Sequence, residues 1–179
     1  MANIQKKKIG LLGGSFDPAH KGHLSISKIA IKKLKLKKIY WIITKKNPFK
    51  TRPFYSLDER IKHAKKITKT QKRIKLIYVD NIIQSSRIID VINYFIKKKR
   101  IKNIFFMIGS DNLMHFHKWK SWKKIVNLVK LVVFSRKGYD RKGMKSIVVK
   151  NFKNRIIFIK NRPIHISSTQ IKKRTKLNI

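Results

Sequence analysis

The chain has 179 residues, of which 42% are hydrophobic and none is cysteine. This length and composition indicate a globular domain with its own core, and they exclude a disordered chain, a disulfide-stabilised fold and a cysteine-based metal site. Lys and Arg number 47 against 7 Asp and Glu, a formal charge of +40, which attracts anionic ligands such as nucleotides.

The positive charge has two interpretations. It could serve a nucleic acid or an anionic membrane, or it could reflect composition, because Lys and Ile are the residues that an AT-rich genome favours. The basic residues are spread along the whole chain, which favours composition, and we expect neither a specific nucleic-acid partner nor a membrane. No apolar run reaches the roughly 18 residues of a membrane span. The apolar stretch before Gly13 is too short for a secretion signal, so we expect a cytoplasmic protein.

Short β-branched runs alternate with longer segments of helical spacing. The apolar runs predict strands at Lys8–Leu12, Lys38–Ile43, Ile74–Val79, Ile104–Ile108, Leu131–Phe134 and Arg155–Ile159. The spacing predicts helices over His20–Leu36, from the capping box at Ser56 to about Thr68, from a cap at Ser86 through Phe95, and over Trp119–Val129. A mobile loop is predicted over Gly138–Ser146.

This alternation predicts an α/β fold, a doubly wound parallel sheet covered by helices on both faces. In such sheets ligands bind at the carboxyl ends of the strands, near the point where the strand order reverses. The candidate site is therefore formed by the loops that follow Leu12, Ile43, Ile108 and Phe134.

The most specific segment lies between the first strand and the first helix. It reads Gly13-Gly14-Ser15-Phe16-Asp17-Pro18-Ala19-His20-Lys21-Gly22-His23. Glycines let main-chain N–H groups approach a phosphate or ribose closely, and His20 and His23 share one side of a first helical turn. Because a helix N-terminus also attracts anions, the segment predicts a phosphate-binding loop.

Two other interpretations of this segment are weaker. The HxxH spacing of His20 and His23 also suits zinc, but no third ligand lies at a useful spacing, since His115 and His117 are distant. We therefore expect no metal held by protein side chains. The chain has neither a dinucleotide GxGxxG nor a Walker GxxxxGK[ST] motif, which argues against a P-loop kinase or ATPase.

Three segments carry a resemblance to a known superfamily. Residues 14–23 resemble the GxFDPxHxGH signature of the nucleotidyltransferases, and residues 166–172 (Ile-Ser-Ser-Thr-Gln-Ile-Lys) resemble their second signature, ISSTxIR. Residues 109–119 are similar to the GxDxLxxFxxW segment of bacterial nicotinate-nucleotide adenylyltransferases. The resemblance covers nearly the whole chain. It implies one Rossmann-like nucleotidyltransferase domain over residues 1–179, shortened after about residue 172.

The resemblance implies an enzyme that transfers AMP from ATP to nicotinate mononucleotide, giving deamido-NAD and pyrophosphate in NAD biosynthesis. The attacking phosphate oxygen is already anionic, so such a reaction depends on positioning and charge stabilisation rather than on a general base. Mg²⁺ is implied as a cofactor bound through the ATP phosphates. The oligomeric state is left open.

The resemblance also implies roles for individual residues. His20 and His23 would hold the ATP phosphates and stabilise charge as pyrophosphate leaves, and Asp111 would bind ribose hydroxyls. The implied ATP-binding set is Gly13, His20, His23, Gly109, Asp111, Arg136, Ser168, Thr169 and Lys172. The implied mononucleotide-binding set is Gly14, Ser15, Phe16, Lys50 and Trp119, with Trp119 stacking on the pyridine ring.

The chain departs from the family pattern at two positions. Lys172 stands where Arg is expected, which keeps the charge but loses the planar fork. Ile88 lies where many members carry a hydroxyl residue near the nicotinate carboxylate. Two alternatives therefore stay open: a sister adenylyltransferase for nicotinamide mononucleotide or pantetheine phosphate, and a basic nucleic-acid-binding protein on this fold.

Overall fold

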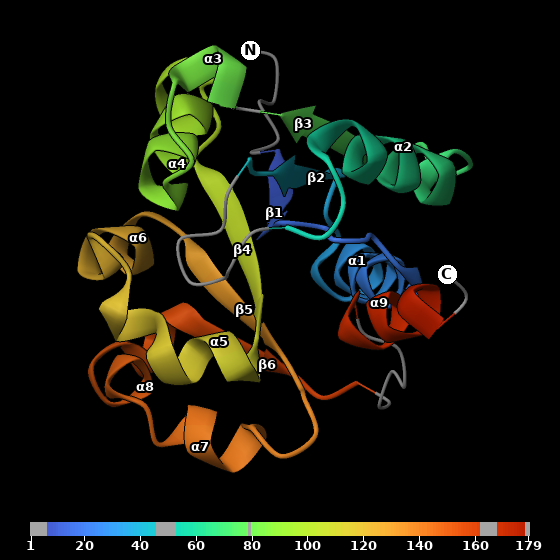
Figure 1. Cartoon of the computed structure of the whole chain (residues 1–179). Helices are drawn as coiled ribbons and strands as arrows, with labels where there is room; N and C mark the ends of the chain where they lie inside the picture. The colour runs from blue at the N-terminus through green and yellow to red at the C-terminus, as the bar shows by residue number, and fades with distance from the viewer. Residues whose placement is uncertain (1–6, 46–52, 79, 162–167, 178–179) are drawn as a thin grey trace.

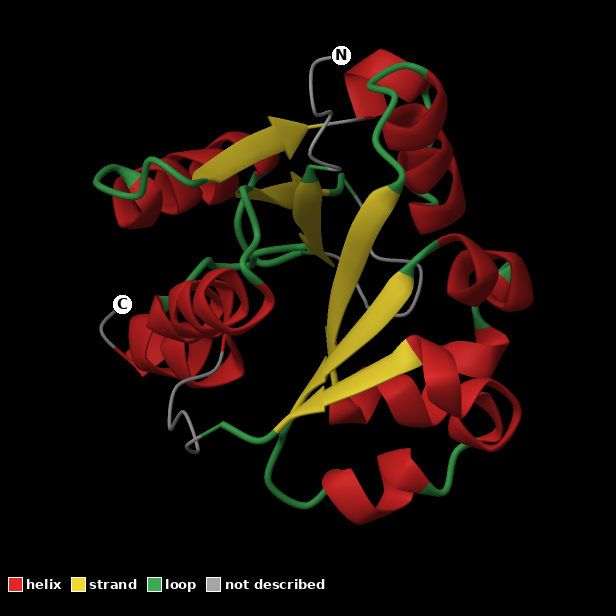
Figure 2. Ribbon diagram, turned by 180° about the vertical axis from the view of Figure 1, so that it is seen from behind, coloured by secondary structure: helices red, strands yellow, loops and turns green. Residues whose placement is uncertain are grey.

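A parallel sheet runs through the centre of the molecule (Figures 1 and 2). The computed structural model describes residues 7–45, 53–78, 80–161 and 168–177. The sheet has six strands in the order β3-β2-β1-β4-β5-β6. Their bounds are β1 Lys8–Gly14, β2 Lys38–Ile43, β3 Ile74–Tyr78, β4 Asn103–Gly109, β5 Lys130–Phe134 and β6 Ile156–Ile159.

Helices fill the connections between the strands. The α-helices are α1 Lys21–Leu34, α2 Leu57–Thr68, α3 Asp80–Ile83, α4 Ile88–Lys97, α5 Ser110–His115, α6 Trp122–Leu128, α7 Asp140–Met144, α8 Ile147–Phe152 and α9 Ser168–Leu177. Two 3-10 turns, η1 Phe116–Lys118 and η2 Lys153–Arg155, complete the described elements. None of the helices among the described residues is long and apolar enough to cross a bilayer.

The strand order reverses beside β1. β1 pairs in parallel with β2 on one side and with β4 on the other. The chain first winds outward through β2 and β3, then returns to β4 on the opposite side of β1 and continues outward. The ends of β1 and β4 therefore form the switch point, where a doubly wound sheet binds its ligands.

Side chains of each strand alternate between two apolar layers, as the pleat requires. In β4, Phe106 belongs to the layer with α4, α5, α6 and α8, whereas its neighbours Phe105 and Met107 belong to the layer with α1 and α2. Both views show the sheet between these two groups of helices, with α9 beside α1 (Figures 1 and 2). A sheet buried on both faces explains why its strands are nearly continuous apolar runs.

The predicted fold class and all the predicted strands are confirmed, with small changes at their ends. β1 extends to Gly14, so both glycines predicted to follow the strand are its last residues. Val79, predicted as the end of β3, lies outside the described residues. β4 and β5 each begin one residue earlier than predicted, and β6 begins at Ile156.

Two of the helix predictions and the loop prediction need correction. The cap predicted at Ser86 is wrong: Arg87 is the N-cap of α4, without a side-chain cap. The helix predicted over Trp119–Val129 is shorter, because Trp119 is extended and Ser121 is left-handed, so α6 begins at Trp122. The loop predicted over Gly138–Ser146 contains α7. The short helices α3, α5, α7 and α8 lack the long apolar stripe that spacing arguments need.

Candidate active site

Two histidines cap the helix that follows β1. His20 is the N-cap of α1, and its Nδ1 accepts a hydrogen bond from the Gly22 N–H at 3.0 Å. The Nδ1 of His23 in turn accepts from the His20 N–H at 3.2 Å. This is the reciprocal geometry of a capping box, here built from imidazoles instead of the usual hydroxyl and carboxylate side chains. The same bonds that begin the helix therefore fix both rings.

The capping bonds determine where the His20 proton lies. Because Nδ1 accepts a hydrogen bond, the proton of the neutral ring is assigned to Nε2, which makes that edge a donor. Burial and the positive charge of Arg136 lower the pKa of His20 to about 4. His20 is therefore a neutral donor in the free protein, held 3.9 Å from the His23 ring, centroid to centroid.

Aromatic side chains pack against the histidine pair. The Phe16 ring stacks on Trp41 at 4.9 Å and contacts His23 at the same centroid distance. Trp41 Nε1 donates to Ser27 Oγ, which donates to the His23 carbonyl. Phe16 is 2% exposed, so its side chain belongs to the core.

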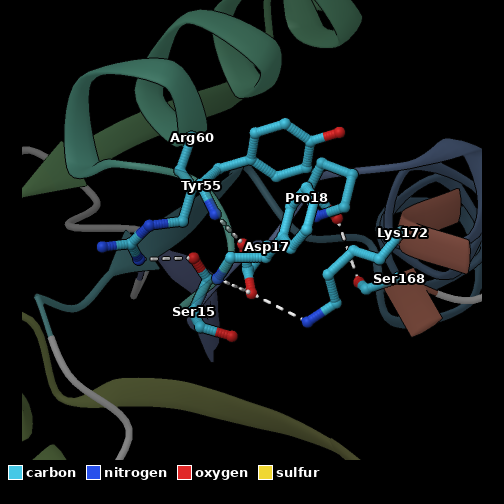
Figure 3. Close-up of polar contacts among 8 residues, drawn as sticks. Ser15, Asp17, Pro18, Tyr55, Arg60, Ser168 and Lys172 are labelled. Carbon is cyan, nitrogen blue, oxygen red and sulfur yellow. Dashed lines mark hydrogen bonds and ion pairs between the residues drawn. The ribbon is translucent and has the colours of Figure 1, made fainter. Parts of the chain in front are cut away.

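Asp17 joins the loop after β1, residues 15–19 and hereafter the first loop, to two distant segments (Figure 3). Its carboxylate accepts from the N–H groups of Phe54 and Tyr55 at 3.0 and 2.9 Å, and pairs with Lys172 Nζ at 2.9 Å. Burial alone would raise the pKa of Asp17, but the two amide bonds and Lys172 outweigh it and hold the pKa below its usual value. An ionised Asp17 therefore ties the first loop to the start of α2 and to α9.

The second signature meets the first one in space, although 150 residues separate Ser168 from Pro18. Ser168 Oγ donates to the Pro18 carbonyl at 3.0 Å, while Thr169 is exposed on α9. Lys172, at the position expected for Arg, pairs with Asp17, and its side chain is 29% exposed. The structure thus brings α9 to the first loop by contacts that leave the Lys172 charge at the rim of the site.

A second group of residues lies at the end of β4. Gly109 is the N-cap of α5. Arg136 Nη1 pairs with Asp111 Oδ2 at 3.1 Å. A Cβ built on Gly109 would lie 2.3 Å from Asp111 Oδ1 and 3.2 Å from Arg136 Nε. Only glycine at this position lets the carboxylate and the guanidinium meet.

Asp140 fixes the position of Arg136. Its carboxylate accepts from Ser110 Oγ at 2.6 Å, from the Arg136 N–H at 2.9 Å, and from Ser135 Oγ. Burial would raise the pKa of Asp140, but these bonds outweigh it and hold the pKa below its usual value. The segment predicted as a mobile loop therefore contains the anchor that joins the end of β5 to α5.

Trp119 lies over the face of the sheet opposite the histidines. Its ring is 4.9 Å from Phe116 and 6.1 Å from Phe106, and the side chain is half-buried. A Cβ built on Gly13 would lie 3.8 Å from Phe106 and 4.0 Å from Ile88. The predicted stacking residue and the unusual Ile88 thus lie near the glycine end of β1, on one apolar face.

The structure gathers most of the predicted site residues around the switch point. The contacts given above join the first loop, the two histidines, Gly109, Asp111, Arg136, Ser168 and Lys172. Lys50 lies outside the described residues. Sequence reasoning missed Arg60, Asp17 and Asp140 as supports of the site. Arg60 shares the spacing of the buried Ala64 and Thr68, but in a chain this basic an arginine carries little signal.

Comparison with known proteins agrees with this geometry. The model of the cytidylyltransferase-like family matches residues 11–174. A probable nicotinate-nucleotide adenylyltransferase of Pelagibacter ubique is 49% identical over 172 residues, which are 96% of this chain and 95% of the relative. A protein of Ruegeria sp. with the same description is 35% identical over 73% of this chain and 68% of its own length.

A solved structure shares the fold. The Plasmodium falciparum nicotinic acid mononucleotide adenylyltransferase complexed with NaAD superposes with a TM-score of 0.72 over 93% of this chain and 83% of that chain, at 18% identity. This likeness shows the fold alone. The family model and the curated relatives show to which family the chain belongs. The chain belongs to the cytidylyltransferase-like nucleotidyltransferases and, within them, to the family of the nicotinate-nucleotide adenylyltransferases.

Proposed function

We propose that the protein transfers the adenylyl group of ATP to nicotinate mononucleotide, giving deamido-NAD and pyrophosphate. A phosphate oxygen of the mononucleotide forms a bond to the α-phosphorus of ATP as the bond from that phosphorus to the pyrophosphate oxygen breaks. Both electrons of the broken bond leave with pyrophosphate. The nucleophile is already an anion, so no residue has to remove a proton, and the site supplies orientation and charge stabilisation.

The observation that carries this proposal is the pair of fixed histidines at the N-terminus of α1. Their Nδ1 atoms are used to cap the helix, which leaves the opposite edge of the His20 ring to donate to phosphate oxygen. The helix N-terminus adds a positive dipole end on the same side, and Arg136 adds a full charge near His20. Hydrogen-bond donors and positive charge that are already in place thus stabilise the negative charge that develops on the departing pyrophosphate.

The remaining roles follow from position. Asp111, with Gly109, is proposed to hold the ATP ribose through its acceptor oxygens. Gly14 and the main chain of Ser15 and Phe16 are proposed to line the mononucleotide, and Gly13 is proposed to contact ATP. Trp119 is proposed to stack on the pyridine ring, because its ring lies on the apolar face that Gly13 opens.

Magnesium is proposed to arrive with ATP. Among the described residues, no three His, Asp or Glu side chains lie together as a protein-held ion would need. Mg²⁺ keeps several waters and readily binds through substrate phosphates. Here it would bind through the phosphates of ATP. We further propose that the protein works in the cytoplasm on these small-molecule substrates.

Replacing His20 tests the proposal. His20→Ala removes the Nε2–H donor, and loss of one such donor typically lowers kcat by roughly 100-fold or more. Pyrophosphate release with Mg-ATP and nicotinate mononucleotide measures the change. Thr169→Ala, on the exposed side of α9, is a variant of the second signature with a milder expected effect. An unchanged kcat for His20→Ala would contradict the role given to the histidine.

A further inference from the structure

A buried arginine bonds to the main chain of the first loop (Figure 3). Arg60, in the first turn of α2, is 2% exposed. Its Nη1 donates to the carbonyl oxygens of Ser15 at 2.7 Å and Thr44 at 2.8 Å, and its Nη2 donates to that of Lys45 at 3.1 Å. One guanidinium thus holds the main chain just beyond the carboxyl ends of both β1 and β2.

The bond to Ser15 sets the direction of the next amide. The peptide between Ser15 and Phe16 is trans, since the only cis bond among the described residues is Asp17–Pro18. In a planar trans peptide, C=O and N–H point in opposite directions. Because Arg60 draws the Ser15 carbonyl toward α2, the Phe16 N–H points away from α2.

The conformation of Phe16 needs this support. Its φ is 46°, in the left-handed region that a bulky side chain rarely occupies. Two contacts hold it there: the ring stacked on Trp41 and the preceding carbonyl bonded to Arg60. Lysine would replace the second contact poorly, because its compact ammonium lacks the planar fork with which Arg60 reaches three carbonyls at once.

We propose that Arg60 is a positioning residue for the mononucleotide substrate: by holding the Ser15 carbonyl it presents the Phe16 amide to the phosphate or ribose of that substrate. The inference rests on the proposed function for the identity of the ligand. Arg60 itself touches no substrate, because it is buried behind the loop. Its bonds to Thr44 and Lys45 give these two residues just past the end of β2 the same support.

The test compares Arg60→Lys with Arg73→Lys. Arg73 is the matched control, because it also donates to main-chain carbonyls, those of Leu36 and Lys37. These two residues lie just before the amino end of β2, away from the proposed site. We expect Arg60→Lys to raise KM for nicotinate mononucleotide about tenfold while KM for ATP changes less than about twofold, since one well-placed bond is worth about a factor of ten. Arg73→Lys should leave both constants unchanged. Equal rises in both KM values for Arg60→Lys would overturn the proposal.

A second readout does not depend on turnover. With ¹⁵N-phenylalanine the protein gives amide signals from its 10 Phe residues, of which a Phe16→Leu variant identifies one. We expect nicotinate mononucleotide to shift this signal and slow its exchange in the wild-type protein, and the ligand-free signal to move in Arg60→Lys but not in Arg73→Lys. If nicotinate mononucleotide neither shifts the Phe16 amide signal nor slows its exchange in an active wild-type enzyme, the inference about Arg60 is overturned and the proposed function stands. A wild-type protein that neither turns over nor binds the mononucleotide would instead count against the proposed function.

Discussion

Replacing Asp17 by Asn should destabilise the protein measurably while keeping the side chain's size. The Asp17 carboxylate accepts from two main-chain N–H groups and from Lys172. Asparagine keeps one acceptor oxygen and turns an NH₂ group toward the other amide. A lost bond to a charged acceptor costs about 1.5–3 kcal/mol, and the partly exposed Lys172 pair adds about 1 kcal/mol at most. We expect a loss of about 2–4 kcal/mol.

Thermal unfolding monitored by circular dichroism measures this loss. For a chain of this length it corresponds to a fall in Tm of roughly 5–15 °C. Asp111→Asn is the matched control, because the Asp111 carboxylate has an arginine partner at the surface, and such pairs contribute less than about 1 kcal/mol. In a Lys172→Met background, Asp17→Asn should cost less, by the coupling energy of the pair.

Two results would refute this reasoning. One is an Asp17→Asn variant whose Tm equals that of Asp111→Asn, which would mean that the bonds to Phe54 and Tyr55 contribute nothing. The other is an identical loss with and without the Lys172 ammonium, which would remove the proposed link between the first loop and α9.

Three further predictions concern the site. Gly109→Ala should raise KM for ATP about tenfold, because the new methyl group displaces Asp111; an unchanged KM in steady-state kinetics would argue against ribose binding there. Trp119→Ala should raise KM for the mononucleotide and spare that for ATP, whereas equal losses would indicate only packing on Phe116. His20 should not titrate between pH 5 and 8 by proton NMR, since its pKa is about 4. Between pH 6.5 and 4 the unfolded state then binds the extra proton, so the free energy of unfolding falls as pH falls, and His20→Gln should abolish this part of the dependence.

Much of the fold could be predicted because its strands are strongly apolar. A parallel sheet buried on both faces gives continuous β-branched runs, and each such run became a strand. The capping box at Ser56 also predicted α2 correctly, because its hydroxyl and carboxylate bond locally. The cap at Ser86 failed because Ser85, not Ser86, bonds across that turn: its Oγ donates to Asp90 and accepts from the Arg87 N–H.

The supports of the site were harder to predict than the site itself. The histidines lie in a dense local motif, so their role could be inferred from spacing. Arg60 acts on main-chain carbonyls 15 to 45 positions away, and Asp140 bonds to Ser110, 30 positions away, so these contacts leave no local pattern. The +40 charge hides such residues further, since a functional arginine resembles the many basic residues at the surface.

The central claim is the choice of substrate. The most direct measurement is pyrophosphate release by the purified protein with Mg-ATP and, in parallel, nicotinate mononucleotide, nicotinamide mononucleotide and pantetheine phosphate. We predict strong preference for nicotinate mononucleotide, which would show that Ile88 and Lys172 are tolerated in this site. Faster turnover of either other acceptor, or no pyrophosphate with any of them, would contradict the account.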